Sequence, residues 1–298
     1  MTKAQENADL HMHSTASDGG YSPSSLLDKC KDVGLQYIAL TDHDTTEGVK
    51  EAMDRGKELG ITVIPGIEFS TKYHGKSVHI LGYGLDYDND ELCQMLKGHQ
   101  QMRRKRLDVI LGKLKAVGLE LTAEDVLEFV DGGSIGRPHV AKALIKKKYV
   151  QDVAEAFDKY LAEGRPCYVS KEKEMTPEEA INWIHRMKGV SIIAHPVYYD
   201  LDDWIEPLVV EYGLQGIEVY HRDHSDEDRI HYEKLLQQIE KKHKISLLKT
   251  GGSDFHHEDY GRVPEPLGRT RIHNSYAEKL VAAIKKSGSA RSATYGLD

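Results

Sequence analysis

Short apolar runs alternate with amphipathic segments over most of the chain. Seven of these runs have the length of a buried strand. They span residues 8–13, 36–42, 61–70, 77–85, 190–196, 216–220 and 245–254. We expect a strand in each of them.

Segments with helix start signals lie between several of these strands. Ser22 and Pro23 supply an N-cap and a first-turn proline for one helix, and Gly34 supplies its stop. Thr176 and Glu179 form a capping box at the start of another helix. Because strands alternate with helices, we predict an α/β fold of parallel strands with helical crossovers, either a barrel or a doubly wound sheet.

The strand pattern stops between about residues 97 and 175, where apolar residues recur at helical spacing. We therefore predict a barrel in two parts, 1–96 and 176–298, interrupted by a helical insertion over 97–175. Residues 97–148 of this insertion contain twelve Lys and Arg against six Asp and Glu, and these cations could face an anion or simply be solvated. Barrel enzymes build their sites at the carboxyl ends of strands, so an insertion at that end is expected to act as a lid or in substrate recognition.

Composition narrows the class of protein. The chain has 298 residues, a formal net charge of −8 and no apolar run long enough to span a membrane. This charge argues against broad coating of nucleic acid. The first residues lack the features of a signal peptide, and Cys30, Cys93 and Cys167 match no paired spacing. We expect a cytoplasmic protein with structural cysteines and no stable protein partner.

Imidazoles and carboxylates stand at or near the ends of nearly all the predicted strands. In the first strand, the period of two places His11 and His13 on the same face. One such histidine is usually an ordinary hydrogen-bonded residue, but a whole set of unpaired ionisable groups at a barrel mouth would cost stability. We therefore predict a metal centre built from His11, His13, Asp18, His43, Glu68, His79, His195, Asp254 and His256.

The types of ligand indicate the chemistry of this centre. Imidazole and carboxylate without thiolate favour zinc, manganese or iron, and magnesium is a further candidate. Nine ligands suit two or three divalent ions, manganese being the first choice, with Glu68 or Asp254 as a bridge. Such a centre lowers the pKa of bound water and neutralises phosphoryl oxygens. We predict hydrolysis of a phosphate ester by a metal-bound hydroxide, without a covalent nucleophile.

The motifs D-L-H-x-H-S, T-D-H-D, P-G-x-E, V-H-I-L-G-Y, A-H-P and G-S-D-x-H occur in this order over residues 9–256. They resemble those of the PHP (polymerase and histidinol phosphatase) family of metal-dependent phosphoesterases. The resemblance implies a distorted (β/α)7 TIM-like PHP barrel with a trinuclear metal centre. It implies one metal bound by His11, His13 and Asp254, a second bound by His79 and His195 and bridged to the first by Glu68, and a third bound by Asp18, His43 and His256.

The insertion carries G-R-P-H-V-A at residues 136–141 and, further on, E-A-F-D-K-Y-L-A-E-G-R-P. Both are similar to the PHP branch of 3′,5′-nucleoside bisphosphate phosphatases, some of which also act as 5′→3′ exonucleases on short RNA. The similarity implies that Arg137, assisted by His139, binds the phosphate that is not hydrolysed, since a guanidinium matches phosphate geometry. Arg137 could instead pair with a surface carboxylate.

Several further residues have weaker assignments. His221 ends the sixth strand and is expected to contact substrate or metal. Asp9, Asp42 and Asp44 flank expected ligands and should orient them. His224 is expected at the surface, and a contact of Arg103, Arg104 or Arg106 with substrate is left open.

The sequence thus predicts a metal-dependent phosphatase that converts a small nucleotide, most simply a 3′,5′-nucleoside bisphosphate, to the 5′-nucleotide. Trimming of short 5′-phosphorylated RNA in the 5′–3′ direction is a further expectation. One alternative is a small-metabolite phosphatase of the histidinol-phosphate type, in which the insertion is only a lid. Another is a non-catalytic nucleic-acid-binding or regulatory PHP module, although such a module would not need the whole ligand set.

Overall fold

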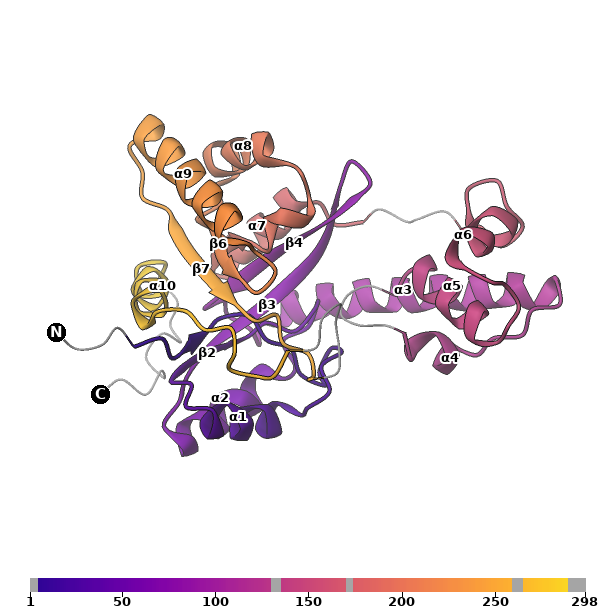
Figure 1. Ribbon diagram of the computed structural model, residues 1–298, viewed down its shortest axis with the longest axis horizontal. Coiled ribbons are helices and arrows are strands. Elements are labelled where there is room, and N and C mark those ends of the chain that lie inside the picture. Colours follow the sequence, from indigo (N-terminus) through magenta and orange to yellow (C-terminus); the bar gives the residue numbers. More distant parts are fainter. Residues whose placement is uncertain (1–4, 130–134, 170–173, 259–264, 289–298) are drawn as a thin grey trace. The chain divides into compact units, whose positions relative to one another are not determined.

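The computed structural model describes residues 5–129, 135–169, 174–258 and 265–288 (Figure 1). The chain divides into two compact units. The first unit is formed by Met1–Cys93 and Met175–Asp298, and the second by Gln94–Glu174. Every helix within the described ranges is too short or too polar to cross a membrane.

The first unit contains one sheet, which has seven strands in the described residues and follows their order along the chain. Its two ends approach each other, because Leu10 N donates to the carbonyl of Gly251 (3.1 Å) and Met12 forms a bridge with Phe255. The sheet is therefore a nearly closed barrel, as predicted. The strands are β1 (Ala8–Asp9), β2 (Tyr37–Leu40), β3 (Thr62–Tyr73), β4 (Lys76–Tyr83), β5 (Val190–Ile193), β6 (Gly216–His221) and β7 (Leu248–Gly252).

The strand directions correct one prediction. β1, β2 and β3 are parallel, as are β5, β6 and β7, but β4 is antiparallel to both of its neighbours. β3 and β4 form a hairpin whose turn residues His74 and Gly75 both have positive φ, 46° and 81°. A two-residue turn of this kind joins antiparallel strands directly, so no helical crossover is needed between them.

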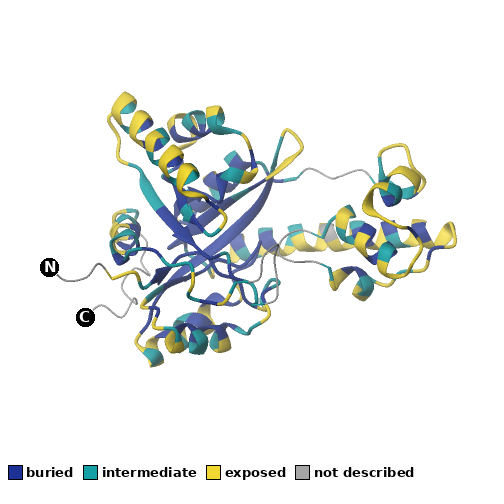
Figure 2. Ribbon diagram, in the orientation of Figure 1, coloured by how far each residue is buried: buried dark blue, intermediate teal, exposed yellow. Residues whose placement is uncertain are grey.

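Helices of the first unit surround this sheet. Their starts follow the predicted capping: Ser22 accepts a hydrogen bond from Ser25 N, and Thr176 and Glu179 form a reciprocal capping box. The strands are buried while the outer helix faces are exposed (Figure 2). The helices are α1 (Pro23–Asp32), α2 (Val49–Leu59), α7 (Pro177–Arg186), α8 (Asp202–Tyr212), α9 (Asp226–His243) and α10 (Asn274–Lys286), with a 3-10 turn at Pro196–Tyr198.

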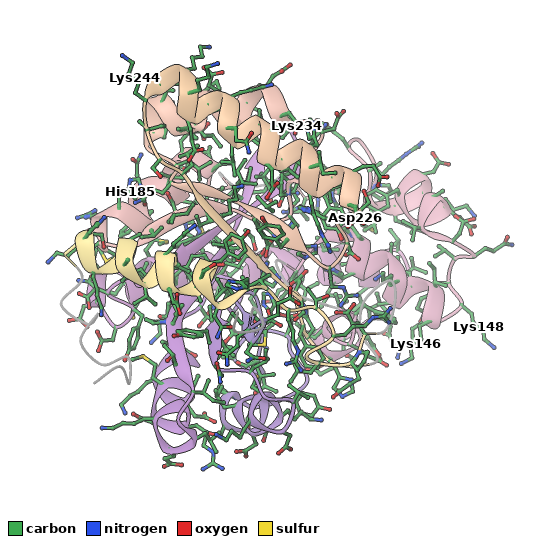
Figure 3. All side chains as sticks on the ribbon, turned by 60° about the vertical axis from the view of Figure 1, so that its left-hand side comes forward. Lys146, Lys148, His185, Asp226, Lys234 and Lys244 are labelled. Atoms are coloured by element: carbon green, nitrogen blue, oxygen red, sulfur yellow. The ribbon has the colours of Figure 1, made fainter. Side chains whose placement is uncertain are left out.

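The charged residues at the two ends of α9 have the signs that the helix dipole favours. Asp226 lies at the start of α9, and Lys244 lies just beyond its end (Figure 3). Acidic residues near the N-terminus and basic residues near the C-terminus both stabilise a helix. Lys234 lies between them on the same helix, so α9 presents a charged face.

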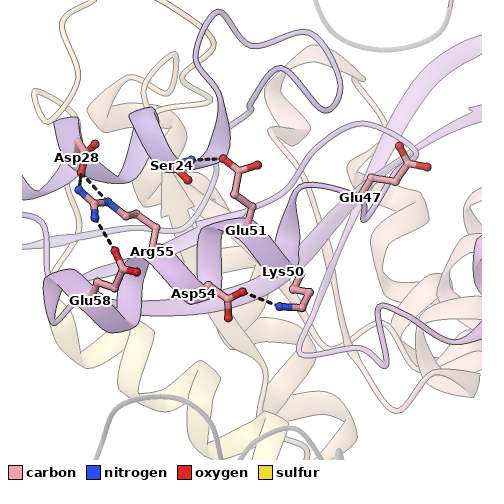
Figure 4. A pocket seen from close by; sticks show the side chains of 8 residues that line it. All are labelled: Ser24, Asp28, Glu47, Lys50, Glu51, Asp54, Arg55 and Glu58. Atoms are coloured by element: carbon pink, nitrogen blue, oxygen red, sulfur yellow. Dashed lines mark hydrogen bonds and ion pairs between the residues drawn. The ribbon is translucent and has the colours of Figure 1, made fainter.

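A surface hollow between α1 and α2 is lined by charged side chains that pair with one another (Figure 4). Arg55 contacts Asp28 (2.6 Å) and Glu58 (2.5 Å), and Glu51 accepts a hydrogen bond from Ser24 N (2.9 Å). Exposed ion pairs of this kind contribute at most about 1 kcal/mol each. They join the two helices, and the five carboxylates and two cations of the lining leave the hollow negatively charged.

The second unit consists of helices joined by loops, without a strand in its described residues, and has an apolar core of its own. Leu107, Leu114, Val140, Leu144 and Cys167 belong to this core. The thiol of Cys167, like those of Cys30 and Cys93, is free. The helices are α3 (Asp90–Ala116), which begins in the first unit, α4 (Ala123–Leu127), α5 (Arg137–Lys146) and α6 (Val153–Ala156), which continues as a π-helical turn over Phe157–Leu161.

The junction of β6 and β7 allows a test of the barrel. A Cβ added to Gly216 would lie 2.2 Å from the carbonyl oxygen of Leu248, so Gly216→Ala must separate the two strands. We expect it to lower the free energy of unfolding by about 1–3 kcal/mol. Gly112 lies in α3 with open space around it, so Gly112→Ala should raise that free energy by about 0.5–1 kcal/mol. Denaturant unfolding followed by circular dichroism measures both, and equal effects would contradict this strand pairing.

Candidate metal centre

The barrel brings all nine predicted ligands into one cluster. His11 and His13 follow β1, His43 follows β2, and Asp254 and His256 follow β7. The others come from a loop, from the middle strands and from the end of β5. Groups of donor atoms within 4.8 Å of one another include His11, His13, Glu68 and Asp254; His43, Glu68 and His79; and His13, Asp18, His43 and His256. His195 joins them through Glu68, with Nε2 3.0 Å from Oε1.

The carboxylate of Glu68 lies at the centre of this cluster and is fully buried. Its two oxygens face different sets of imidazoles. Oε1 lies 2.8 Å from His79 Nδ1 and 3.0 Å from His195 Nε2. Oε2 lies 3.1 Å from His11 Nε2, 3.2 Å from His13 Nε2 and 3.3 Å from His43 Nδ1. This arrangement suits a carboxylate that bridges two cations.

Electrostatics keeps this carboxylate ionised. Burial alone would raise the pKa of Glu68, but the imidazoles of His43, His11 and His79 outweigh it and hold the pKa well below its usual value. Asp254 is similar, since burial is outweighed by His11 and His13 and its pKa is also lowered. The site therefore contains two ionised carboxylates, that of Glu68 fully buried and that of Asp254 partly exposed.

A second group of donors lies beside the first. His256 Nε2 is 3.0 Å from Asp18 Oδ2, and the rings of His13 and His256 stack with centroids 4.0 Å apart. Asp254 Oδ1 lies 3.0 Å from His13 Nε2 and therefore connects the two groups.

Several buried atoms of the cluster make no hydrogen bond of good geometry within the described residues, although some of them lie about 3 Å from one another. They are both ring nitrogens of His13, both carboxylate oxygens of Asp18, Nδ1 of His43, Nε2 of His256 and Oδ1 of Asp254. Buried polar atoms without partners are costly and rare, so these atoms fit a cation. Imidazole nitrogen together with carboxylate oxygen is a donor set for divalent metals.

Two residues of the site were missed from the sequence. Glu218 on β6 is fully buried, with Oε1 3.0 Å from His11 Nδ1 and Oε2 accepting from His195 N (2.8 Å). Tyr199 places its hydroxyl 2.9 Å from His195 Nδ1. The signal for Glu218 was available, because a lone glutamate within an apolar strand is almost never buried without a partner.

The three aspartates beside the ligands orient the main chain rather than the imidazole rings. Asp9 accepts from Ser253 N (3.0 Å) and from His11 N (3.3 Å), which joins β1 to the end of β7. Asp42 accepts from Ser14 N (2.7 Å) and so orders the loop after His13. In the same way, Asp44 accepts from Ser70 N (3.0 Å) on β3.

His221 reaches the cluster from the end of β6. Its Nε2 lies 3.7 Å from Asp254 Oδ2, and its Nδ1 accepts from Asp223 N (3.2 Å). The prediction for His224 was wrong, because its ring is buried next to that of His221 and its Nδ1 lies 2.8 Å from the carbonyl of Val219. Burial lowers the pKa of His224.

Arg137 and His139 lie at the start of α5 in the second unit. Arg137 donates to the carbonyl of Leu161 (2.9 Å), and its guanidinium lies 5.6 and 5.2 Å from the ring centres of Phe157 and Tyr168. His139 accepts from Gly136 N through Nδ1 (3.0 Å) and so caps the helix. The ion pairs found among the described residues include none for Arg137. They therefore give no support to the alternative in which Arg137 pairs with a surface carboxylate.

Arg106 on α3 belongs to the same unit and lies close enough to Arg137 for the two charges to repel. Burial, followed by the charge of Arg137, lowers the pKa of Arg106. Its Nε makes no hydrogen bond within the described part of the chain. Two neighbouring guanidinium groups are a site that an anion would stabilise.

Comparisons with known proteins place this geometry in a family. The family model described as PHP domain matches residues 9–169. The chain is 34% identical to a 5′-3′ exoribonuclease of Haemophilus influenzae over 83% of this chain and 89% of that protein. It is 34% identical to a 3′,5′-nucleoside bisphosphate phosphatase of Chromobacterium violaceum over 84% of this chain and 87% of that protein.

Solved structures agree with this result. An amidohydrolase from Chromobacterium violaceum, with bound sulfate and no metal, has a TM-score of 0.68 at 33% identity and covers 93% of this chain and 96% of its own. A putative metal-dependent phosphoesterase from Bifidobacterium adolescentis has a TM-score of 0.71 at 28% identity with the same coverage. The chain therefore belongs to the PHP domain family of phosphoesterases.

Proposed function

We propose that the protein is a metal-dependent phosphatase that converts a 3′,5′-nucleoside bisphosphate to the 5′-nucleotide. The observation that carries this proposal is the buried cluster around Glu68, whose unpartnered nitrogen and oxygen atoms suit two to three divalent ions. We propose manganese as the ion. The groups would be His11, His13, Glu68 and Asp254; Glu68, His79 and His195; and Asp18, His43 and His256.

When bound, such ions supply positive charge that lowers the pKa of water and neutralises a phosphoryl group. Glu68 would hold two of the groups at a fixed separation, one on each oxygen. His221 would contact the substrate directly. Its Nδ1 accepts from Asp223 N, so the neutral ring carries its proton on Nε2 and can donate it to a phosphoryl oxygen. Water attacks in this scheme, and no side chain forms a covalent intermediate.

The phosphate that is not hydrolysed would be bound in the second unit. We assign it to Arg137, with Arg106 and His139 as neighbours, because an anion would relieve the repulsion between the two guanidinium groups. A relative is named as a phosphatase for a substrate with two phosphates, which supports this assignment. A phosphatase for a metabolite with one phosphate would leave the arginine pair without a role.

Short RNA with a 5′-phosphate is a second candidate substrate. Relatives from Haemophilus influenzae and Escherichia coli are named as 5′-3′ exoribonucleases. A 5′-phosphorylated RNA end has a phosphate monoester at the 5′ position and a phosphodiester at the 3′ position, so its phosphorus groups stand at the same two positions as those of a bisphosphate, and the bond cleaved would be that of the diester. The three free thiols support the proposed cytoplasmic location.

The first prediction concerns metal dependence. A chelator should abolish release of phosphate from a 3′,5′-bisphosphate, and added Mn²⁺ should restore it, because the carboxylates of the cluster alone would repel the substrate. Phosphate release is measured together with elemental analysis of the same preparation. Undiminished turnover by protein shown to be free of metal would overturn the proposal.

A second prediction separates a bridging carboxylate from a supporting one. Glu68→Gln should lower kcat/KM more than about a hundredfold, beyond the roughly 10–100-fold typical of groups that only orient ligands. Asp44→Asn is the matched control, because Asp44 accepts from the main-chain N–H of Ser70, which an asparagine oxygen can also do, and asparagine tolerates its φ of 51°. Similar mild losses from both variants would mean that Glu68 does not bridge ions.

The third prediction concerns Arg137. Arg137→Ala removes a charge-assisted contact of roughly 1.5–3 kcal/mol, so kcat/KM for the bisphosphate should fall about ten- to a hundredfold. The corresponding monophosphate never uses this contact, so its kcat/KM should not change. Arg165→Ala is the control, since Arg165 is an exposed arginine of the same unit paired with Asp158 (2.5 Å). An equal loss on both substrates would remove Arg137 from the recognition of the second phosphate.

A further inference from the structure

β6 carries a fully buried carboxylate, that of Glu218, which none of the proposed ligand groups uses. Its neighbours along the strand, Ile217 and Val219, are buried apolar residues. An ionised carboxylate in such surroundings is strongly unfavourable unless it is paired and hydrogen-bonded. Both of its oxygens are engaged within the metal centre, so the centre is the place to look for its role.

Glu218 is close enough to His11 and His221 to be considered a metal ligand itself. The positions of its contacts argue against this. Oε1 lies 3.0 Å from His11 Nδ1, whereas the other ring nitrogen of His11, Nε2, faces Glu68 (3.1 Å) and Asp254 (3.4 Å). Oε2 accepts from the main-chain N–H of His195 (2.8 Å), which is not a metal ligand. Glu218 therefore lies behind the ligands and not among them.

The contact with His11 selects one tautomer of that ring. An ionised carboxylate only accepts, so the proton between the two residues belongs to Nδ1 of His11. The lone pair of the neutral ring is then on Nε2, which lies 3.1 Å from Glu68 Oε2 and 3.4 Å from Asp254 Oδ1. The lone pair of His11 and the carboxylates of Glu68 and Asp254 thus face a common space, which suits a cation.

The contact with His195 acts on the main chain. His195 has φ 24° and ψ 61°, a conformation that L residues rarely adopt and that persists only where the surroundings hold it. The hydrogen bond from its N–H to Glu218 is one of these restraints, and the contact of its ring with Tyr199 is another. The ring is thereby directed at Glu68 Oε1, on the opposite oxygen from His11.

We propose that Glu218 is a positioning residue that holds His11 and His195 as ligands of two neighbouring metals. One side chain thus sets the tautomer of the first ligand and the backbone of the second. The inference rests on the proposed metal centre but not on the proposed substrate.

Glu218→Gln tests this with almost no change of shape. If the amide nitrogen faces His11, Nδ1 must accept, so Nε2 carries the proton and cannot bind metal. If the amide is reversed, its nitrogen faces the N–H of His195, and two donors meet. Either orientation removes one of the two restraints, so we expect Mn²⁺ affinity of at least one site to fall about 10–100-fold.

The measurement is equilibrium dialysis against graded free Mn²⁺ without substrate, with Mn per chain from elemental analysis. Circular dichroism shows that each variant is folded at the temperature used. Glu233→Gln is the matched control, since Glu233 on α9 accepts from Tyr220 (2.5 Å) and Lys249 (3.2 Å) and is not in the cluster. This control should retain wild-type affinity.

A folded Glu218→Gln variant with wild-type Mn²⁺ affinity would overturn the inference, even if it unfolded at a lower temperature, because that is the result of a merely structural role. If this variant does not fold, Glu218→Asp decides. Aspartate keeps an accepting carboxylate but is too short to reach both partners, so it should also weaken binding, and wild-type affinity would again overturn the inference. A wild-type protein that binds no Mn²⁺ would instead overturn the metal centre, and the inference with it.

Discussion

One buried carboxylate determines how this site is built. Among the described residues, Glu68 faces five imidazoles that come from four different parts of the barrel. Nitrogen atoms of these rings surround the carboxylate, and the space between them suits cations that both kinds of group would hold. Fold and site therefore depend on each other, since residues after β1, β2 and β5 and on β4 must come together before Glu68 has these partners.

The residues behind the ligands also serve the site and the fold at the same time. Asp9 joins the end of β1 to the end of β7, and Glu218 joins the sixth strand to ligands that follow the first and the fifth. These are contacts between segments far apart in the sequence. The ring orientations that a metal requires are thus set by groups that also fix the order of the strands.

Much of the fold and most of the site could be read from the sequence, because strands and helix caps leave local signals. His11 and His13 could be paired from the period of a strand alone, and the helix start at Thr176 from its capping box. The direction of β4 was predicted wrongly although the sequence held a signal, because only residues 71–76 separate the two predicted strands and a helical crossover needs more. Glu218 also left a signal, as a lone glutamate in an apolar strand, but its partners and the burial of His224 belong to the assembled barrel, which no local pattern reports.

The hairpin of β3 and β4 has a consequence for how the protein reaches its folded state. Glu68 and His79 are 11 positions apart, whereas His11 and Glu218 are separated by 207. Closing the short loop costs little chain entropy, and joining the two distant segments costs considerably more. One edge of the metal centre therefore forms from contacts local in the chain, and the other edge forms only when the N-terminal and C-terminal strands meet. A divalent ion that needs ligands from both edges would favour that last step, so metal supply and completion of the barrel are thermodynamically linked.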